Sequence, residues 1–186
     1  MSVMGRSRYK IYDSDYPHFI TSSVVEGYPI FSDPKAAEVL LNALKFLQIQ
    51  RDTILYSYVI MENHIHLIVQ SDELSKKIQA FKSWTARNII EVFKDNGNYY
   101  QLYKLKKARQ HSHTDSIHQL WQQGFHPKQI IGDKMMIQKI EYIHNNPVKR
   151  GFVDHAEDWR YSSARNYMGM KGMIPITLLS GGNTDL

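Results

Sequence analysis

Two histidines separated by one residue are the first side chains here whose types and spacing could bind a metal ion. In His64-Ile65-His66, neighbouring side chains of an extended strand point to opposite faces, so both imidazoles emerge on one face. Two such imidazoles can converge on a divalent cation, and by ligand softness they suit Mn²⁺, Co²⁺ or Zn²⁺ better than Mg²⁺. A chain with nine histidines also contains such pairs by chance, so a structural pair of partly exposed strand histidines is the alternative.

A tyrosine and an asparagine four residues apart form a second chemical group. Tyr142 and Asn146 share one face of a predicted helix, whereas Ile140 and Ile143 belong to its buried stripe. An amide oxygen is a competent ligand for a hard cation, and a tyrosine hydroxyl beside a metal-bound phosphate can act as a nucleophile. The alternative is that Tyr142 packs at a helix end and that Asn145 or Asn146 caps the helix.

The two histidines lie in the second strand of a predicted hairpin. Residues 53–61 and 64–70 are rich in Ile, Leu, Tyr and Val, and only Glu62 and Asn63 separate them. Residues 17–26 form a further β-branched and aromatic run, which predicts a strand that precedes the hairpin.

Helical spacing of apolar residues recurs in three segments. The predicted helices cover residues 34–50, 74–96 and 133–146. Residues 120–125 predict a last short strand, and the basic residues 99–118 are either a helical extension or a loop. This order is typical of an α+β domain of the ferredoxin-like or RRM-like type, an antiparallel sheet with helices on one face and a C-terminal helix that carries Tyr142. The other face is left for a ligand.

Composition limits the classes of protein that the chain can represent. Its 186 residues fit one domain, with a core at about 17–167 and a tail at 168–186. The absence of cysteine excludes disulfides and thiolate chemistry. No apolar run suits a membrane span or a secretory signal, so we expect a cytoplasmic protein without a membrane partner. The net charge of +5 favours polyanionic partners such as nucleic acid.

Four ordered blocks of sequence together are more specific than either motif. They are MENHIHLIV (61–69), LWQ (120–122), YIHNNPVKRG (142–151) and WRYSSA (159–164). In this order they resemble the REP-associated tyrosine transposases of the HUH (His-hydrophobic-His) single-tyrosine superfamily. The resemblance extends from about residue 19 to residue 167.

The resemblance implies a reaction and a set of residues for it. His64, His66 and Asn146 would bind a divalent metal, Mg²⁺ or Mn²⁺, and Tyr142 would be the nucleophile. The implied activity is that of a single-stranded DNA endonuclease and strand transferase, which acts at palindromic hairpins through a 5′-phosphotyrosine. A homodimer is one oligomeric state that the resemblance allows. Glu62 stands where members of the family usually have proline, and the basic segment 99–118 is longer than the usual connection.

Basic side chains mark the regions that we expect to bind DNA. The candidates are Arg87, Lys104, Lys106, Lys107, Arg109, Lys149 and Arg150. The last two lie just beyond Asn146 and are the preferred residues. The main alternative function is a catalytically silent DNA-binding protein of the same fold. An RNA-binding module is a second alternative, but it would place stacking aromatic residues where His64 and His66 stand.

Overall fold

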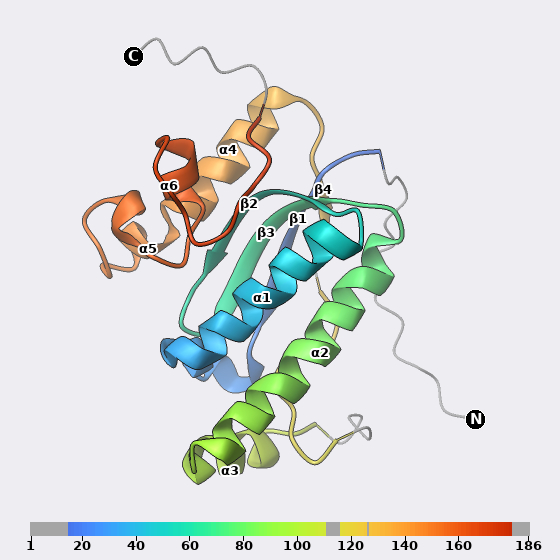
Figure 1. The fold of residues 1–186 in the computed structure, drawn as a ribbon, viewed down its shortest axis with the longest axis vertical. Coiled ribbons are helices and arrows are strands. Elements are labelled where there is room, and N and C mark those ends of the chain that lie inside the picture. Colours follow the sequence, from blue (N-terminus) through green and yellow to red (C-terminus); the bar gives the residue numbers. More distant parts are fainter. Residues whose placement is uncertain (1–14, 111–115, 126, 180–186) are drawn as a thin grey trace.

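The computed structural model describes residues 15–110, 116–125 and 127–179 (Figure 1). Its centre is a four-stranded antiparallel sheet in the order β2-β3-β1-β4. The strands are β1 (His18–Ser23), β2 (Ile54–Ile60), β3 (His64–Gln70) and β4 (Lys128–Gln129). The predicted α+β fold with a ferredoxin-like sheet is therefore confirmed.

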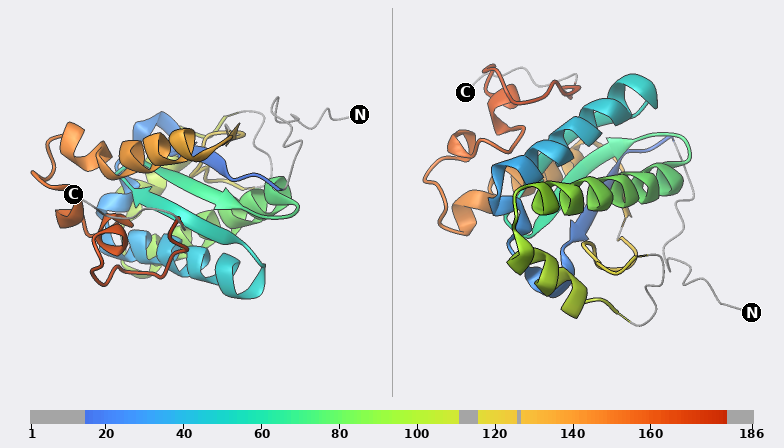
Figure 2. Two further views of the ribbon diagram at one scale, coloured as in Figure 1. Left: turned by 90° about the horizontal axis from the view of Figure 1, so that it is seen from above. Right: turned by 60° about the horizontal axis from the view of Figure 1, so that its bottom comes forward.

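Two long helices, α1 (Pro34–Gln50) and α2 (Leu74–Asp95), cover one face of the sheet (Figure 1 and Figure 2). The backbone N–H of Lys35 donates to the Asp33 carboxylate at 2.8 Å, and Pro34 occupies the first turn, so α1 begins where the sequence predicts. Both helices bury apolar side chains against those that β3 turns toward them. This main core includes Leu40, Leu44, Ile78, Ile65, Leu67 and Val69.

The helix that carries Tyr142, α4 (Asp133–His144), packs against the opposite face of the sheet (Figure 2). A second apolar cluster joins α4 to β2 and β3. It consists of Val59, Met61, Ile68, Ile130, Met136, Ile140 and Ile143. The face on which we expected an open ligand site is thus partly covered by the helix that bears the candidate nucleophile.

Three shorter helices complete the described structure. They are α3 (Tyr99–Lys107), α5 (Asn146–Lys149) and α6 (Ala164–Tyr167), together with 3-10 turns at Val25–Gly27, Ile30–Ser32 and Ala156–Asp158. The basic segment 99–118 thus begins as a helical extension, and its residues 111–115 lie outside the described part. Within the described part of the chain, no helix combines the length and the apolar character that a membrane span requires.

The predicted strand at residues 120–125 is wrong. In this segment only Trp121 forms an isolated bridge, with Val24, and the last strand is β4. The Lys82 ammonium binds backbone carbonyls of the segment, including that of Gly124, where φ is +72°. A left-handed residue bends the chain away from an extended path, so a longer strand cannot form here.

Two predicted boundaries also move. β1 ends at Ser23 rather than near residue 26, because Glu26 adopts a positive φ of 52° inside a 3-10 turn. Pro147 interrupts the helical hydrogen bonds but does not end the helical path, since Asn145 keeps α-helical angles (φ −80°, ψ −2°) and α5 follows directly.

Candidate active site

β3 presents both histidines to the face that α4 covers. His64 is half-buried and His66 is only 5% exposed. Their ring centroids lie 4.7 Å apart, with the ring planes at 71°. Ile65 between them is buried in the main core on the other face. The alternation of the strand therefore fixes the two imidazoles side by side.

Each imidazole makes a hydrogen bond through its Nδ1 atom. The Asn63 amide NH₂ donates to the Gly27 carbonyl at 3.2 Å, so the Asn63 oxygen is the atom that faces His64, and His64 Nδ1 donates to it at 2.6 Å. This arrangement leaves the lone pair of His64 on Nε2. His66 Nδ1 lies 2.8 Å from the hydroxyl of Thr21, its partner on β1. Contacts of this kind orient histidines whose other nitrogen binds a metal.

The surroundings keep both imidazoles neutral. Burial, with smaller effects from the charges of His64 and Lys139, lowers the pKa of His66 to about 3. Burial also lowers the pKa of His64, although the Glu62 carboxylate opposes this shift. At neutral pH neither ring needs to lose a proton before its nitrogen can coordinate a cation.

α4 places the ring of Tyr142 against His66. The two ring centroids are 5.4 Å apart, and Phe19 lies 5.8 Å from Tyr142 and stacks on His66 at 5.3 Å. The orientation of α4 is fixed because Ile140 and Ile143 are buried against the sheet. Tyr142 itself remains 40% exposed, so its side chain is open to a ligand from solvent.

Asn146 follows Tyr142 by one helical turn. The helical angles of Asn145 carry the path from α4 into α5, which begins at Asn146. The Asn146 residue is half-buried. The structure thus brings His64, His66 and Tyr142 into ring contact and sets Asn146 one turn beyond the tyrosine.

Lys139 is a further candidate that the sequence patterns did not single out. Its Nζ atom lies 5.5 Å from the ring centroid of Tyr142 and 4.8 Å from that of Phe19. No carboxylate of the described residues forms an ion pair with it. Its position three residues before Tyr142 is a signal that could have found it. The contact of Thr21 has no such signal, because it depends on the register between β1 and β3.

Two predicted DNA-binding residues lie at the same site. Lys149 Nζ is 5.7 Å from the ring centroid of Tyr142, so two ammonium groups lie near this ring. Arg150 forms an ion pair with Glu62, the residue that occupies the usual proline position. The pair ties the end of α5 to the β2–β3 connection. The surface around Tyr142 is therefore suited to a phosphate.

Comparison with known proteins identifies the family. Residues 13–146, which are more than half of the chain, match the family described as Transposase IS200 like. The chain belongs to the IS200-like transposase family.

Two curated relatives that bear the name REP-associated tyrosine transposase are similar to parts of this chain. A Haemophilus influenzae protein with the name of a REP-associated tyrosine transposase is 31% identical over 108 residues, which are 56% of this chain and 54% of that protein. The REP-associated tyrosine transposase of Escherichia coli K12 is 31% identical over 68 residues, 37% of this chain and 41% of that protein. The chain thus spans about half the length of the curated relatives that it matches.

The fold has a solved counterpart. The structure of a REP-associated tyrosine transposase bound to a REP hairpin matches with a TM-score of 0.64 at 18% sequence identity, and the match covers 100% of this chain and 99% of that chain. At this identity the likeness establishes a shared fold.

Imidazole nitrogens, as in His64 and His66, and an amide oxygen, as in Asn146, are donor types that divalent cations accept. Among the described residues, no three or more His, Cys, Asp or Glu side chains are placed to hold a metal. Of the other donor types in the described part of the chain, the amide oxygen of Asn146 is a candidate for a further ligand beside His64 and His66. Such a mixed nitrogen and oxygen set suits Mn²⁺ and also accepts Mg²⁺.

The other predicted DNA-binding residues lie away from this site. Arg87 belongs to α2, on the other face of the sheet, and Arg109 follows α3. The three lysines Lys104, Lys106 and Lys107 belong to α3, which lies at the far end of α2, at the bottom of Figure 1, whereas α4 and α5 lie in its upper left part. The predicted DNA-binding residues are therefore not gathered at one site: Lys149 and Arg150 lie near Tyr142, and the lysines of α3 lie apart from them.

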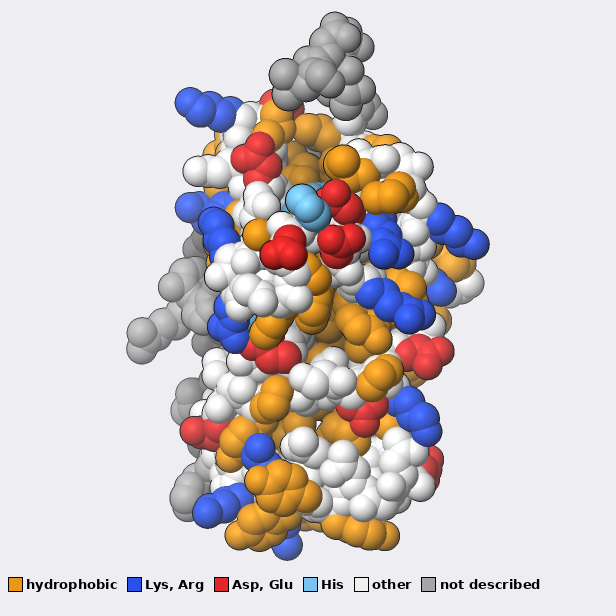
Figure 3. Space-filling model, turned by 90° about the vertical axis from the view of Figure 1, so that its left-hand side faces the viewer, with side chains coloured by type: hydrophobic (Ala, Val, Ile, Leu, Met, Phe, Trp, Pro, Cys, Tyr) orange, Lys and Arg blue, Asp and Glu red, His pale blue; other side chains and the backbone are white. Residues whose placement is uncertain are grey.

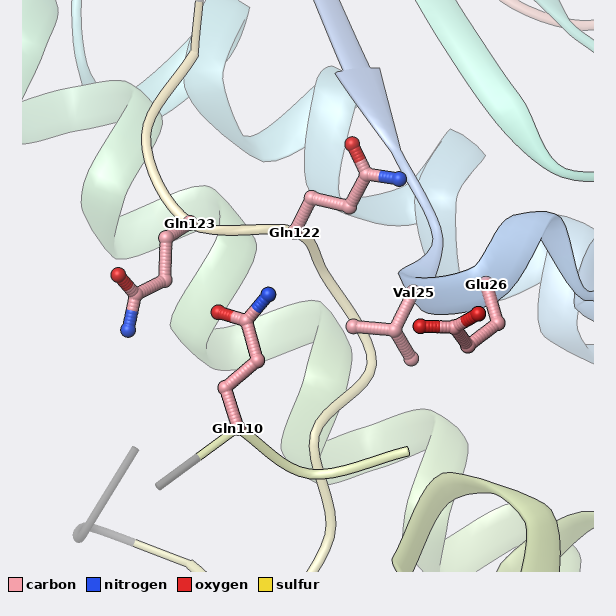
Figure 4. Close-up of a pocket in the computed structure, with 5 residues that line it drawn as sticks. All are labelled: Val25, Glu26, Gln110, Gln122 and Gln123. Carbon is pink, nitrogen blue, oxygen red and sulfur yellow. The ribbon is translucent and has the colours of Figure 1, made fainter. Parts of the chain in front are cut away.

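A polar pocket of about 340 Å³ is a poor alternative site (Figure 4). It is lined by Val25, Glu26, Gln110, Gln122 and Gln123. Among its described lining residues the only charged group is the Glu26 carboxylate, which repels phosphate. None of its lining residues belongs to the histidine and tyrosine cluster.

Proposed function

We propose that this chain is a single-stranded DNA endonuclease and strand transferase that uses Tyr142 as its nucleophile. The contact between the half-exposed Tyr142 ring and the buried His66 ring, in a member of the IS200-like transposase family, supports this most directly. A tyrosine hydroxyl can attack a phosphodiester, and lysines at the same surface can stabilise the charge that develops on the phosphate.

His64, His66 and Asn146 are the residues proposed to hold the divalent cation, Mg²⁺ or Mn²⁺. When bound, the cation draws electron density from the scissile phosphate and stabilises the negative charge that develops on it. The chain contributes the orientation of the two rings, through Asn63 and Thr21, and their neutral state, through burial. A charged imidazole would repel the cation, so this neutral state is a requirement of the site.

In the proposed reaction the hydroxyl oxygen of Tyr142 attacks phosphorus in line with the leaving 3′-oxygen. The bond between phosphorus and the 3′-oxygen breaks, the tyrosine loses its proton, and the 3′-oxygen gains one. The products are a 5′-phosphotyrosine and a free 3′-hydroxyl. Because the tyrosine ester replaces the phosphodiester without hydrolysis, a second 3′-hydroxyl can attack it and join two strands.

Lys139 and Lys149 are proposed to bind the non-bridging oxygens of the attacked phosphate. Both ammonium groups lie near the Tyr142 ring, at 5.5 Å and 5.7 Å from its centroid. Charge-assisted hydrogen bonds from lysine to phosphate are among the stronger polar contacts in proteins. They would hold the phosphate at Tyr142 and stabilise the charge of the transition state.

The proposed substrate is single-stranded DNA beside a hairpin formed by a palindrome. The net charge of +5 favours a polyanion. The solved transposase with the matching fold is bound to a REP hairpin, and we propose the same class of substrate for this chain. The alternative is a protein of this fold that binds such DNA without cutting it.

The direct test compares wild type with Tyr142→Phe in forming a covalent protein-DNA adduct. The assay uses a single-stranded hairpin substrate with Mn²⁺ or Mg²⁺ and separates adducts on a denaturing gel. We expect the substitution to abolish the adduct, because no oxygen remains to attack, and to leave DNA binding nearly unchanged.

Tyr16→Phe is the matched control, because Tyr16 has the same exposure of 40% and lies outside the site. This variant should form the adduct at the wild-type rate. An adduct with Tyr142→Phe would show that another residue is the nucleophile. Tight DNA binding by wild type without any adduct would favour the binding protein over the nuclease.

A further inference from the structure

Three tyrosines of α3 project into solvent. Tyr99, Tyr100 and Tyr103 are 70%, 67% and 61% exposed. Tyr99 and Tyr103 lie one helical turn apart, with Tyr100 beside them, so the three rings share one side of the helix. Single exposed aromatics are common on protein surfaces, but a contiguous group of them marks an interaction surface.

The same side of α3 is strongly basic. The helix has three lysines in its last turn and no acidic residue. Lys104 Nζ lies 5.3 Å from the ring centroid of Tyr100 and 4.1 Å from that of Tyr28. At the lower end of Figure 3, where α3 lies, hydrophobic side chains are interleaved with Lys and Arg side chains. We name this surface the α3 platform; it consists of Tyr99, Tyr100, Tyr103, Lys104, Lys106 and Lys107.

The buried side of α3 holds the platform in place. Leu102 and Leu105 are 7% and 0% exposed and belong to the main core. The Asn98 side chain caps the first turn by accepting from the backbone N–H of Gln101 at 3.4 Å. The backbone N–H of Gln119 donates to the Leu105 carbonyl at 3.3 Å. Because the helix is fixed in the free protein, little ordering entropy is lost when a ligand binds to it.

Exposed rings among cations match the chemistry of a nucleic acid strand with unpaired bases. Bases stack on aromatic side chains, and lysines neutralise the phosphates between them. A duplex hides the faces of its bases, so it can use the lysines of the platform but not its rings. We infer that the α3 platform binds single-stranded DNA, as a stretch of the substrate away from the phosphate that is cut. That the polymer is DNA rests on the proposed function.

The first test replaces all three tyrosines by serine, as Tyr99→Ser, Tyr100→Ser and Tyr103→Ser in one variant. Binding of a labelled oligodeoxythymidylate of roughly 20 nucleotides is followed by fluorescence anisotropy, in EDTA and in a Tyr142→Phe background. We expect Kd to rise about tenfold or more, because the loss of one base stacked on an aromatic ring already weakens binding by about that factor. Binding of a duplex of the same length should change less than twofold.

Two control variants make this result specific. Phe46→Ser removes an aromatic ring of α1 that is 52% exposed and lies beside Arg51 at the end of the same helix. The Kd of this variant should stay at the wild-type value. Replacement of the three α3 tyrosines by phenylalanine keeps the rings and should keep the affinity.

The lysines give a second, independent measurement. The logarithm of the association constant falls as the logarithm of the salt concentration rises. In the variant with Lys106→Gln and Lys107→Gln this fall should be less steep by about 0.7 per lysine, as expected for phosphate contacts to a single strand. Lys171→Gln, at an exposed lysine outside the platform, should leave the slope unchanged.

Several outcomes would overturn the inference. An unchanged Kd in a serine variant with a wild-type melting temperature would do so, as would an equal loss for duplex and single strand. A wild-type protein that self-associates through these tyrosines, shown by loss of a dimer in the serine variant, would identify the surface as a protein interface instead. The binding assay needs no cleavage, so a wild type that forms no adduct would count against the proposed function alone.

Discussion

Tyr142 and Lys139 share a turn of α4, and their roles in the proposed reaction differ. The tyrosine supplies the atom that attacks, and its substitution removes the reaction. The lysine supplies a positive charge: its Nζ atom lies 4.8 Å from the ring centroid of Phe19 and 5.5 Å from that of Tyr142. A charge that acts mainly in the transition state affects the rate more than it affects DNA affinity.

Lys139→Met should therefore slow adduct formation at saturating DNA by about tenfold to a hundredfold. Lys139→Arg keeps the charge and should retain most of the rate. Lys134→Met, at an exposed lysine near the start of the same helix, is the control and should react like wild type. Single-turnover kinetics on the hairpin substrate measures all three. A rate that Lys139→Met leaves unchanged would remove this residue from the reaction.

At the scale of elements, a buried polar group fastens α4 to the sheet. His144 Nε2 lies 3.2 Å from the Ser57 hydroxyl of β2 and 2.9 Å from that of Ser163. The same Ser163 hydroxyl accepts the backbone N–H of Tyr58 at 2.9 Å. His144 lies two residues after Tyr142, so these contacts hold the end of α4 against β2.

Burial lowers the pKa of His144 to about 4. Above an unfolded-state pKa of about 6.5, His144 is neutral in both states and its contribution to stability is fully present. As the pH falls below that value, His144 binds a proton in the unfolded chain but stays neutral in the folded chain. The free energy of unfolding therefore decreases as the pH falls toward 4. At pH 5 the loss from this one residue is about 2 kcal/mol.

Urea unfolding near neutral pH and near pH 5 tests this linkage. In His144→Gln the loss of unfolding free energy between the two conditions should be smaller than in wild type by about 2 kcal/mol. His155→Gln, at an exposed histidine, should lose as much as wild type. Equal losses in His144→Gln and wild type would mean that His144 is protonated in the folded chain.

An element can be predicted from the sequence when it is determined by residues close to it in the chain. The sequence predicts α1 well, because its cap at Asp33 and its leucines at helical spacing are local features of the chain. β4 was missed, because its two residues extend only through pairing with His18 and Phe19. The face on which His64 and His66 emerge follows from alternation, but its covering by α4 depends on long-range packing that no local pattern shows.

At the scale of the whole molecule, the proposed metal site joins the sheet to the path from α4 to α5. His64 and His66 belong to β3, whereas Asn146 begins α5. A cation bound by all three exists only in the folded chain, because unfolding separates its ligands. Metal binding should therefore appear as added stability, without any need for a cleavage assay.

Mn²⁺ at about 100 times its Kd should raise the unfolding free energy by about 2.7 kcal/mol. A variant with His64→Ala and His66→Ala should lose this increment, and His155→Ala should keep it. Thermal or urea unfolding with and without the metal provides the measurement. If Mn²⁺ still raised the unfolding free energy of the variant that lacks both histidines, the metal would bind at another site.

The two basic regions also belong to this scale. Tyr142 with Lys139 and Lys149 lies on the face covered by α4, and the α3 platform lies at the far end of α2 (Figure 1). A strand that reaches both would be held at the platform while its scissile phosphate meets Tyr142. Substitutions at the first region should change the reaction rate, and those at the second should change affinity.

The most direct test of the central claim is to find the residue that carries DNA in the adduct. Trypsin cleaves after Lys139 and Lys149, so residues 140–149 form one peptide in which Tyr142 is the only hydroxyl-bearing side chain. We predict that mass spectrometry of the nuclease-digested and trypsin-digested adduct finds a nucleotide on Tyr142 of this peptide. A nucleotide on any other residue, with this peptide unmodified, would contradict the proposed mechanism.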